Sequence, residues 1–177
     1  SFPTRRSSDL QTAVLVTGLL LFCSVVKASE QKLCDERSIP IFQCEVSNGK
    51  NVALCADYDQ LGELASLQYR FGKTNNLELV YPTTTGSSIE HFRFNHYFRS
   101  GVEYVKVSFL SGFFKYGLFK NSDENEAENS NSGIEVIDER DRTSEIQILC
   151  RKVFEDTLQT LSSLSCDEDD ALGCDRQ

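Results

Sequence analysis

The chain has 177 residues, a net charge of −9 and seven cysteines, and 40% of its residues are hydrophobic. That length suits one domain with its own core. The charge is uneven, because Leu64 to Lys120 holds seven basic residues against three acidic ones while the flanks are acidic. An acidic molecule of this kind is not expected to bind nucleic acid.

Residues 1–10 read SFPTRRSSDL, which one reading frame of a common short-read sequencing adapter encodes. We expect this segment to be an artefact that does not belong to the protein. Arg5 and Arg6 then carry no export signal, and the true start of the gene is missing.

An apolar segment from Ala13 to Val26 is too short for a membrane span, which needs about 20 apolar residues. It fits the hydrophobic region of a signal peptide, with Val26 and Ala28 at the small-residue positions of a cleavage site. We expect residues 11–28 to be this signal peptide and the mature chain to begin near Ser29. The mature protein would be periplasmic or secreted, without stable membrane insertion.

Cleavage removes Cys23 and leaves six cysteines, an even number that predicts a disulfide framework in an exported chain. The alternative is a lipoprotein attached through Cys23, but Phe22 stands where a lipid-attachment site needs a small residue. Connectivity does not follow from sequence, so the pairing is a hypothesis. Cys166 and Cys174 are close enough to close a local loop. Cys44 and Cys150 lie in the first and last expected strands, where a bridge would join the ends of a sheet. Cys34 and Cys55 are the remaining pair.

Alternation of apolar and polar residues from Ile39 onward predicts strands with one buried face. Asn48-Gly49 predicts a tight hairpin, and Pro82 ends a strand because proline donates no hydrogen bond. The expected strands are Ile39–Val46, Asn51–Ala56, Leu64–Phe71, Leu77–Tyr81, Ile89–Phe98, Val102–Leu110, Phe113–Phe119, Gly133–Ile137 and Glu145–Cys150.

The remaining segments complete a single mainly β domain over residues 29–165. Asn121 to Gly133 is polar and acidic and is expected to be a mobile loop. Apolar residues spaced by three and four predict a short helix from Arg151 to Leu164. Residues 166–177 are expected to form an acidic tail with a local disulfide loop and a solvated acidic turn. About nine short strands and one helix favour an antiparallel β-barrel or sandwich, and a bridge joining the ends of the sheet favours the barrel.

Three segments carry a resemblance to a known family. They are LQYRFGKTNNLELVYP at Leu67 to Pro82, FRFNHYFRSGVEYVKVSF at Phe92 to Phe109, and YGLF at Tyr116 to Phe119. With the cysteines, they resemble a family of small secreted proteobacterial proteins over roughly Cys34 to Cys150. The resemblance implies an envelope or extracellular location in a Gram-negative bacterium and implies no mechanism.

The segment from Ser100 to Tyr104 reads SGVEY and fits the SGxxY motif of periplasmic inhibitors of C-type lysozyme. In that family, which this chain also resembles, the motif's loop enters the lysozyme cleft. The resemblance implies that Ser100, Gly101 and Tyr104 contact lysozyme, although the chain lacks the family's second motif ending in Lys-Gly. The alternative is a Ser-Gly turn or bulge before a strand.

The stretch from His91 to Arg99 is the most unusual in the chain. As a strand it carries polar side chains on one face and phenylalanines on the other. Guanidinium groups, an amide and an aromatic ring on the polar face suit an anionic glycan or a carboxylate. The candidate binding residues are Arg93, Asn95, Tyr97 and Arg99, continued by Tyr69 and Arg70. The alternative is a cationic face that pairs with the protein's own acidic flanks.

The sequence offers little for catalysis or metal binding. It has no GxSxG, HExxH or phosphate-loop motif, and His91 and His96 would lie on opposite faces of a strand. No cysteine pair has CxxC spacing, and Asp167 to Asp170 lacks the order of a calcium loop. No catalytic residue, metal or cofactor is therefore expected.

The function expected from the sequence is that of an exported, non-enzymatic binding module. Its partner would be a protein or an anionic glycan of the cell envelope. Two alternatives are an envelope lysozyme inhibitor and a hydrolase of unrecognised type.

Overall fold

The computed structural model describes residues 32–84, 86, 88–125 and 130–174, apart from the side chain of Arg142. All of them belong to the second of two units into which the chain divides, residues 31–177. The predictions for residues 1–30, which are the adapter segment, the signal peptide and the role of Cys23, lie outside the described residues.

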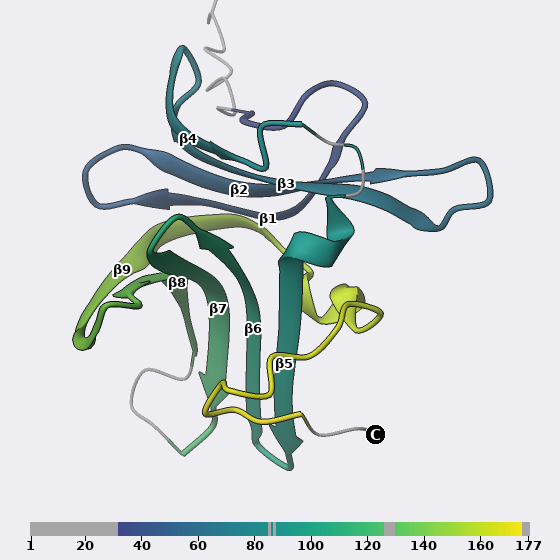
Figure 1. Ribbon diagram of the computed structural model, residues 1–177. Coiled ribbons are helices and arrows are strands. Elements are labelled where there is room, and N and C mark those ends of the chain that lie inside the picture. The colour runs from purple at the N-terminus through teal and green to yellow at the C-terminus, as the bar shows by residue number, and fades with distance from the viewer. Residues whose placement is uncertain (1–31, 85, 87, 126–129, 175–177) are drawn as a thin grey trace, which may run out of the picture. The chain divides into compact units, whose positions relative to one another are not determined.

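The described part of the chain forms nine strands and two short 3-10 helices (Figure 1). In chain order they are β1 Ile39–Val46, β2 Asn51–Tyr58, β3 Leu64–Lys73, β4 Asn76–Tyr81, η1 Ile89–His91, β5 Phe92–Arg99, β6 Val102–Ser111, β7 Phe114–Asp123, β8 Ser130–Asp138, β9 Asp141–Asp156 and η2 Leu158–Leu161. The mainly β, antiparallel fold expected from the alternation is confirmed.

All nine strands belong to one antiparallel sheet in the order β4-β3-β2-β1-β9-β8-β7-β6-β5, curled into a half-barrel (Figure 1). The first and last strands therefore pair in the middle of the sheet, not at its two edges as the sequence analysis assumed. The edges are β4 and β5, which follow each other in the chain. The barrel is open, because β4 and β5 form no backbone ladder with each other in the described part of the chain.

Aromatic side chains join the two ends of the sheet instead. Tyr81 of β4 stacks on Phe109 of β6 with ring centroids 4.7 Å apart, and Phe109 also stacks on Tyr116 at 5.1 Å. Leucines 158, 161 and 164, in and after η2, complete the same core. The curled sheet thus has an inner face that holds the core and an outer face turned away from it.

The three disulfides have the pairing expected from the sequence. Cys44 of β1 is bonded to Cys150 of β9, and the other two pairs are Cys34–Cys55 and Cys166–Cys174. Cys44 is completely buried, so the β1–β9 bridge lies within the core. Three disulfides indicate an oxidising, extracytoplasmic environment.

Three predicted segments differ from the structure. The strand expected from Ile89 begins at Phe92, because Ile89–His91 forms η1. The helix expected from Arg151 to Leu164 exists only as η2, because Arg151–Asp156 continues β9 and pairs with β1. The expected loop from Asn121 to Gly133 is shorter, since β7 runs to Asp123 and β8 begins at Ser130. Backbone pairing across the sheet outweighs local spacing and polarity in the last two segments.

No helix in the described ranges has the length and apolar composition that crossing a bilayer requires.

Removing the central bridge should cost more stability than removing the tail bridge. Cys44→Ala with Cys150→Ala opens a loop with a sequence separation of 106 residues, against 8 for Cys166→Ala with Cys174→Ala. Loop entropy predicts losses of about 4.7 and about 2.5 kcal/mol respectively. Urea unfolding of both double variants measures this difference, and a larger loss in the tail variant would contradict the central role of the β1–β9 bridge.

Candidate functional site

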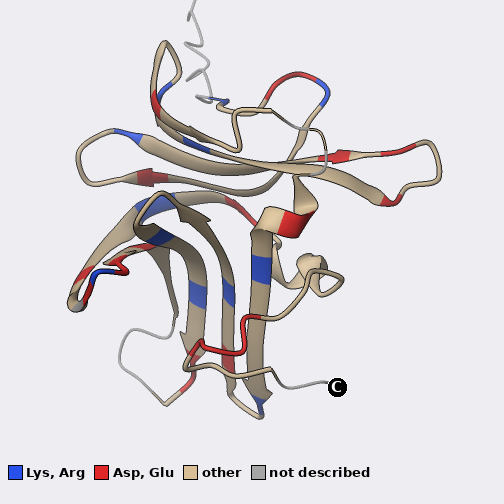
Figure 2. Cartoon of the chain, viewed as in Figure 1, with Lys and Arg blue, Asp and Glu red and all other residues tan. Residues whose placement is uncertain are grey.

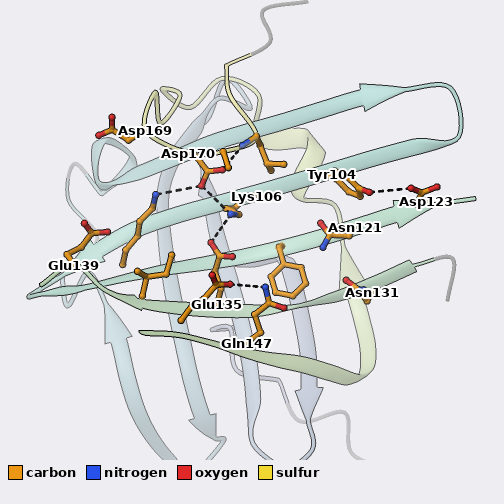
Figure 3. A pocket seen from close by; sticks show the side chains of 16 residues that line it. Tyr104, Lys106, Asn121, Asp123, Asn131, Glu135, Glu139, Gln147, Asp169 and Asp170 are labelled. Carbon is orange, nitrogen blue, oxygen red and sulfur yellow. Dashed lines mark hydrogen bonds and ion pairs between the residues drawn. The ribbon is translucent and has the colours of Figure 1, made fainter. Parts of the chain in front are cut away.

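The outer face of β6–β9 contains a cavity of about 610 Å³ (Figure 3). Its walls come from alternate residues of four neighbouring strands and from the C-terminal segment after η2. The lining includes Tyr104 and Lys106 of β6, Lys115 and Phe119 of β7, Glu135 of β8, and Asp169 to Leu172. A cavity of this volume is within the usual range of small-ligand sites.

Two glycines on neighbouring strands shape the cavity floor. A Cβ at Gly117 would lie 2.7 Å from Cγ of Glu135, its register partner on β8. A Cβ at Gly133 would lie 2.5 Å from the Ile148 carbonyl oxygen and 2.9 Å from Cζ of Phe119. Glycine at these positions therefore lets Glu135 and Phe119 lie flat across the sheet, which brings a carboxylate and a ring to the floor.

Lys106 stands at the centre of the site and is paired with two carboxylates. Its Nζ lies 2.8 Å from Oε1 of Glu135 and 3.2 Å from Oδ2 of Asp170. Burial alone would lower the pKa of Lys106, but the hydrogen bonds and charges of Glu135 and Asp170 together raise it. Lys106 is thus a stable cation whose charge is already compensated within the protein.

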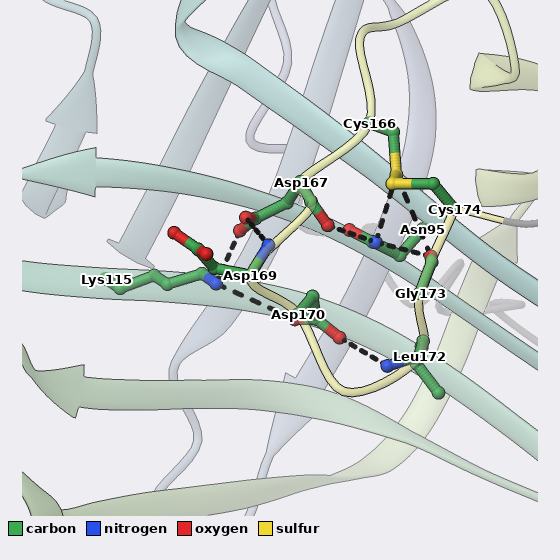
Figure 4. The surroundings of a disulfide bond; sticks show 9 residues. All are labelled: Asn95, Lys115, Cys166, Asp167, Asp169, Asp170, Leu172, Gly173 and Cys174. Atoms are coloured by element: carbon green, nitrogen blue, oxygen red, sulfur yellow. Dashed lines mark hydrogen bonds and ion pairs between the residues drawn. A yellow bond between two sulfur atoms is a disulfide. The ribbon is translucent and has the colours of Figure 1, made fainter.

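The disulfide-closed tail lies on the outer face and is not a free acidic turn (Figure 4). Asn95 Nδ2 donates to the carbonyl oxygens of Asp167 and Gly173, at 2.8 Å each. Lys115 Nζ lies 2.6 Å from Asp167 Oδ2. Of the expected solvated turn, Glu168 and Asp169 are exposed, whereas Asp170 is only 9% exposed.

The tail reaches this face by passing around the edge of the sheet. The Phe94 N–H of edge strand β5 donates to the Ser165 carbonyl oxygen at 2.9 Å, just before the disulfide loop begins. Acidic residues of the loop then cross strands that carry basic residues (Figure 2). The sequence alternative expected such pairing at the cationic face of β5, whereas the pairing lysines are Lys106 of β6 and Lys115 of β7.

The cavity keeps an excess of negative charge after these pairings. Its two lysines, Lys106 and Lys115, both form ion pairs with carboxylates of the protein. The six lining carboxylates are Asp123, Glu135, Glu139, Glu145, Asp169 and Asp170. A cavity with this lining attracts cations more than anions.

The four candidate binding residues of β5 share the outer face as predicted, but the structure does not present them together. Asn95 is 1% exposed because the tail covers it. Tyr97 stacks on Tyr104 with ring centroids 6.1 Å apart. Arg93 is half-buried and Arg99 is exposed at the end of the strand. Asn95 is therefore a docking point for the tail, and the expectation that it faces an external ligand is corrected.

The proposed extension of this face through Tyr69 and Arg70 is wrong. Tyr69 lies in the core, where its ring packs on Phe109 at 5.0 Å and burial strongly raises its pKa. Arg70 lies on β3, where Nη1 donates to the Leu33 carbonyl oxygen and the guanidinium pairs with Asp35. Both side chains are already engaged by other parts of the protein, so neither faces a ligand together with the residues of β5.

Ser100 and Gly101 form the two-residue turn between β5 and β6, in which Arg99 pairs with Val102. Gly101 has a φ of +78°, a conformation that favours glycine. Ser100 is exposed at the tip, whereas Tyr104 is half-buried and its hydroxyl donates to Asp123 at 3.4 Å. The turn reading is confirmed, and contact with lysozyme stays a prediction.

The inner face also carries a row of polar side chains where the core ends. His96 Nε2 lies 3.2 Å from Glu103 Oε1, and Lys120 Nζ lies 3.3 Å from Glu103 Oε2. Ser132 Oγ donates to Asp156 Oδ2 at 2.9 Å. Burial raises the pKa of Asp156, although hydrogen bonds and Lys120 oppose the rise. The row takes one residue from each of β5 to β9 and ends the core with charge pairs.

Sequence reasoning missed the residues that build the outer cavity, chiefly Lys106, Glu135 and Asp170. The sequence analysis placed Lys106 on the polar face of a predicted strand and Glu135 within another predicted strand, but it did not predict that the two side chains meet. The missing information was the tail, which brings Asp170 across 64 residues of sequence to Lys106. The one sequence signal for this contact was the opposite charge of the basic middle strands and the acidic C-terminal flank.

Comparison with protein-family models, curated proteins and solved structures found no significant match. The two resemblances noted from the sequence therefore stay predictions. Within the described ranges, no three His, Cys, Asp or Glu side chains gather as a metal site would require.

Asp156→Asn should raise stability at neutral pH. The pKa of Asp156 is above its ordinary value of 3.8, so ionisation costs more in the folded protein than in the unfolded chain. The gain should be full at pH 7 and vanish as the pH falls below 3.8, where Asp156 is protonated in both states. Urea unfolding at pH 7 and pH 3 measures it.

Asp138→Asn is the control with the opposite sign. Arg140 holds the pKa of Asp138 down at about 2, so this change should lower stability at pH 7 and matter less in acid. A loss of stability in Asp156→Asn at pH 7 would show that the hydrogen bond from Ser132 needs the carboxylate.

Proposed function

We propose that the protein is a periplasmic or secreted binding module and that its outer cavity binds a ligand bearing an amine. The observation that carries the proposal is the charge of the lining, with six carboxylates and two lysines that are already ion-paired. The carboxylates supply acceptors for the hydrogen bonds of an ammonium group.

Other cavity groups suit the same ligand. Asn131 lines the cavity, and its buried Oδ1 has no hydrogen-bond partner among the described residues. Phe119 and Tyr104 both line the cavity, and Figure 3 shows Tyr104 on one side of it. Aromatic rings attract cations as well as apolar groups, which adds to the pull of the carboxylates.

The charge balance also argues against an anionic glycan in this cavity. Lys106 and Lys115 would have to give up Glu135, Asp167 and Asp170 before pairing with an anion, and the displaced carboxylates would repel it. The structure thus supports the binding module expected from the sequence with a different ligand charge. Export is supported by the three disulfides and by the signal peptide expected from the sequence.

Three five-carbon compounds that differ only in end groups test the ligand charge. Pentane-1,5-diamine should shift the NMR signals of the cavity residues, pentane-1,5-diol should do so less, and glutarate should not bind there. Glu145→Gln with Asp169→Asn should weaken diamine binding about fivefold, the effect of losing partly exposed charge pairs. Added salt should weaken it as well.

Glu36→Gln with Glu63→Gln is the matched control. It removes the same charge from exposed positions outside the cavity lining and should leave diamine affinity unchanged. Preferred binding of glutarate, or an equal loss in the control variant, would overturn the proposal.

Inhibition of lysozyme is a second candidate, favoured by the exposed position of Ser100 at a hairpin tip. The purified protein should inhibit a C-type lysozyme, and Ser100→Ala with Tyr104→Ala should abolish inhibition. Ser47→Ala with Tyr58→Ala is the control, since both residues are exposed elsewhere. Unchanged inhibition in the Ser100 and Tyr104 variant would exclude this motif as the inhibitory element.

A further inference from the structure

A second, smaller cavity of about 250 Å³ lies beside the first on the outer face. His91, Arg93, Ser108 and Leu110 contribute to its lining. Lys115, Glu139 and Asp169 line both cavities, so the two adjoin at these residues.

Arg93 lies at the β5 end of the smaller cavity, whose lining also includes Glu139, Asp167 and Asp169. Its Nη1 donates to the carbonyl oxygens of Glu90 and Phe92, at 2.6 and 2.9 Å. Nε and Nη2 have no hydrogen-bond or ion-pair partner among the residues that the structure describes. These two nitrogens form one edge of the guanidinium, which binds a carboxylate through two parallel hydrogen bonds.

The register of the sheet sets the length of the combined groove. Leu110, Lys115, Ile137 and Glu145 face one another on β6, β7, β8 and β9. Leu110 lines the smaller cavity, Lys115 lines both, and Ile137 and Glu145 line the larger one. Arg93 lies on the next strand, β5, where it pairs with Ser108, two residues before Leu110. Four strand spacings separate Arg93 from Glu145, which is about 19 Å.

We propose that the two cavities form one groove that binds a short zwitterionic peptide. The peptide's carboxylate pairs with Arg93, and its amine lies among the carboxylates near Glu145. An extended chain rises about 3.3 Å per residue, so about six residues span the groove. The inference rests on the proposed function, because the amine end uses the same cavity.

The hexapeptide Gly-Ser-Gly-Ser-Gly-Ser tests both ends at once. Isothermal titration compares its free form with the N-acetylated and C-amidated forms. Each modification should weaken binding to the unaltered protein about fivefold, as expected for the loss of one partly exposed charge pair. Gly-Ser is too short to reach both ends and should respond to one modification at most.

Variants assign each end to its partner through double-mutant cycles. Arg93→Gln should weaken binding of the free peptide and make C-amidation without effect, while acetylation still weakens binding. Glu145→Gln should do the reverse. Arg99→Gln is the matched control, because Arg99 is an exposed arginine of the same strand and lines neither cavity. Circular dichroism melting confirms that each variant is folded.

The outcomes separate the inference from the proposed function. If amidation costs the same in Arg93→Gln as in the unaltered protein, the peptide groove is wrong, while Glu145-dependent diamine binding would preserve the proposed function. If acetylation has no effect on the unaltered protein, the orientation and with it the inference are wrong. If neither the diamine nor any peptide binds, both proposals fail.

Discussion

The pairing of β1 with β9 is the contact on which the rest of the structure depends. It joins four strands from the first half of the described chain to five from the second, and without it the sheet would be two separate pieces. The buried Cys44–Cys150 bond fixes this pairing across 106 residues of sequence. Because the joined sheet curls, Tyr81 near one edge reaches Phe109 near the other, and a single core forms between the halves.

The outer face follows from that arrangement. Once the inner face is filled, the polar side chains of β5–β7 are left on the far side, and the chain leaving η2 passes around the β5 edge to meet them. The contacts that hold the tail also neutralise Lys106 and Lys115. A face that looks cationic in sequence thereby becomes one wall of an acidic cavity. Stability and ligand preference arise here from the same ion pairs.

Local pattern predicted the features that depend on neighbouring residues. Alternation located all nine strands, matching β1 at both ends, and cysteine spacing with strand order suggested the three bridges. Prediction from local pattern failed where a segment distant in sequence determines the structure or the burial of a residue. Arg151–Asp156 has helical spacing but extends β9, because β1 offers a pairing edge. Asn95 has a polar position on an alternating strand, yet a loop more than 70 residues away buries it. Tyr69 could not be placed in the core without knowing that β3 packs against β6.

The position of the tail also gives the groove its direction. Its carboxylates compensate the two lysines at the centre, so the unpaired edge of Arg93 is left at one end and carboxylates such as Glu145 at the other. The backbone positions of Arg93 and Glu145 are four strand spacings apart, which is about 19 Å. In the proposed orientation each end of a zwitterionic ligand meets an opposite charge, because the unpaired edge of Arg93 lies at one end and Glu145 at the other. Without the tail, Lys115 would lose its ion pairs with Asp167 and Asp170 while Lys106 would keep Glu135, so the same face would be less acidic.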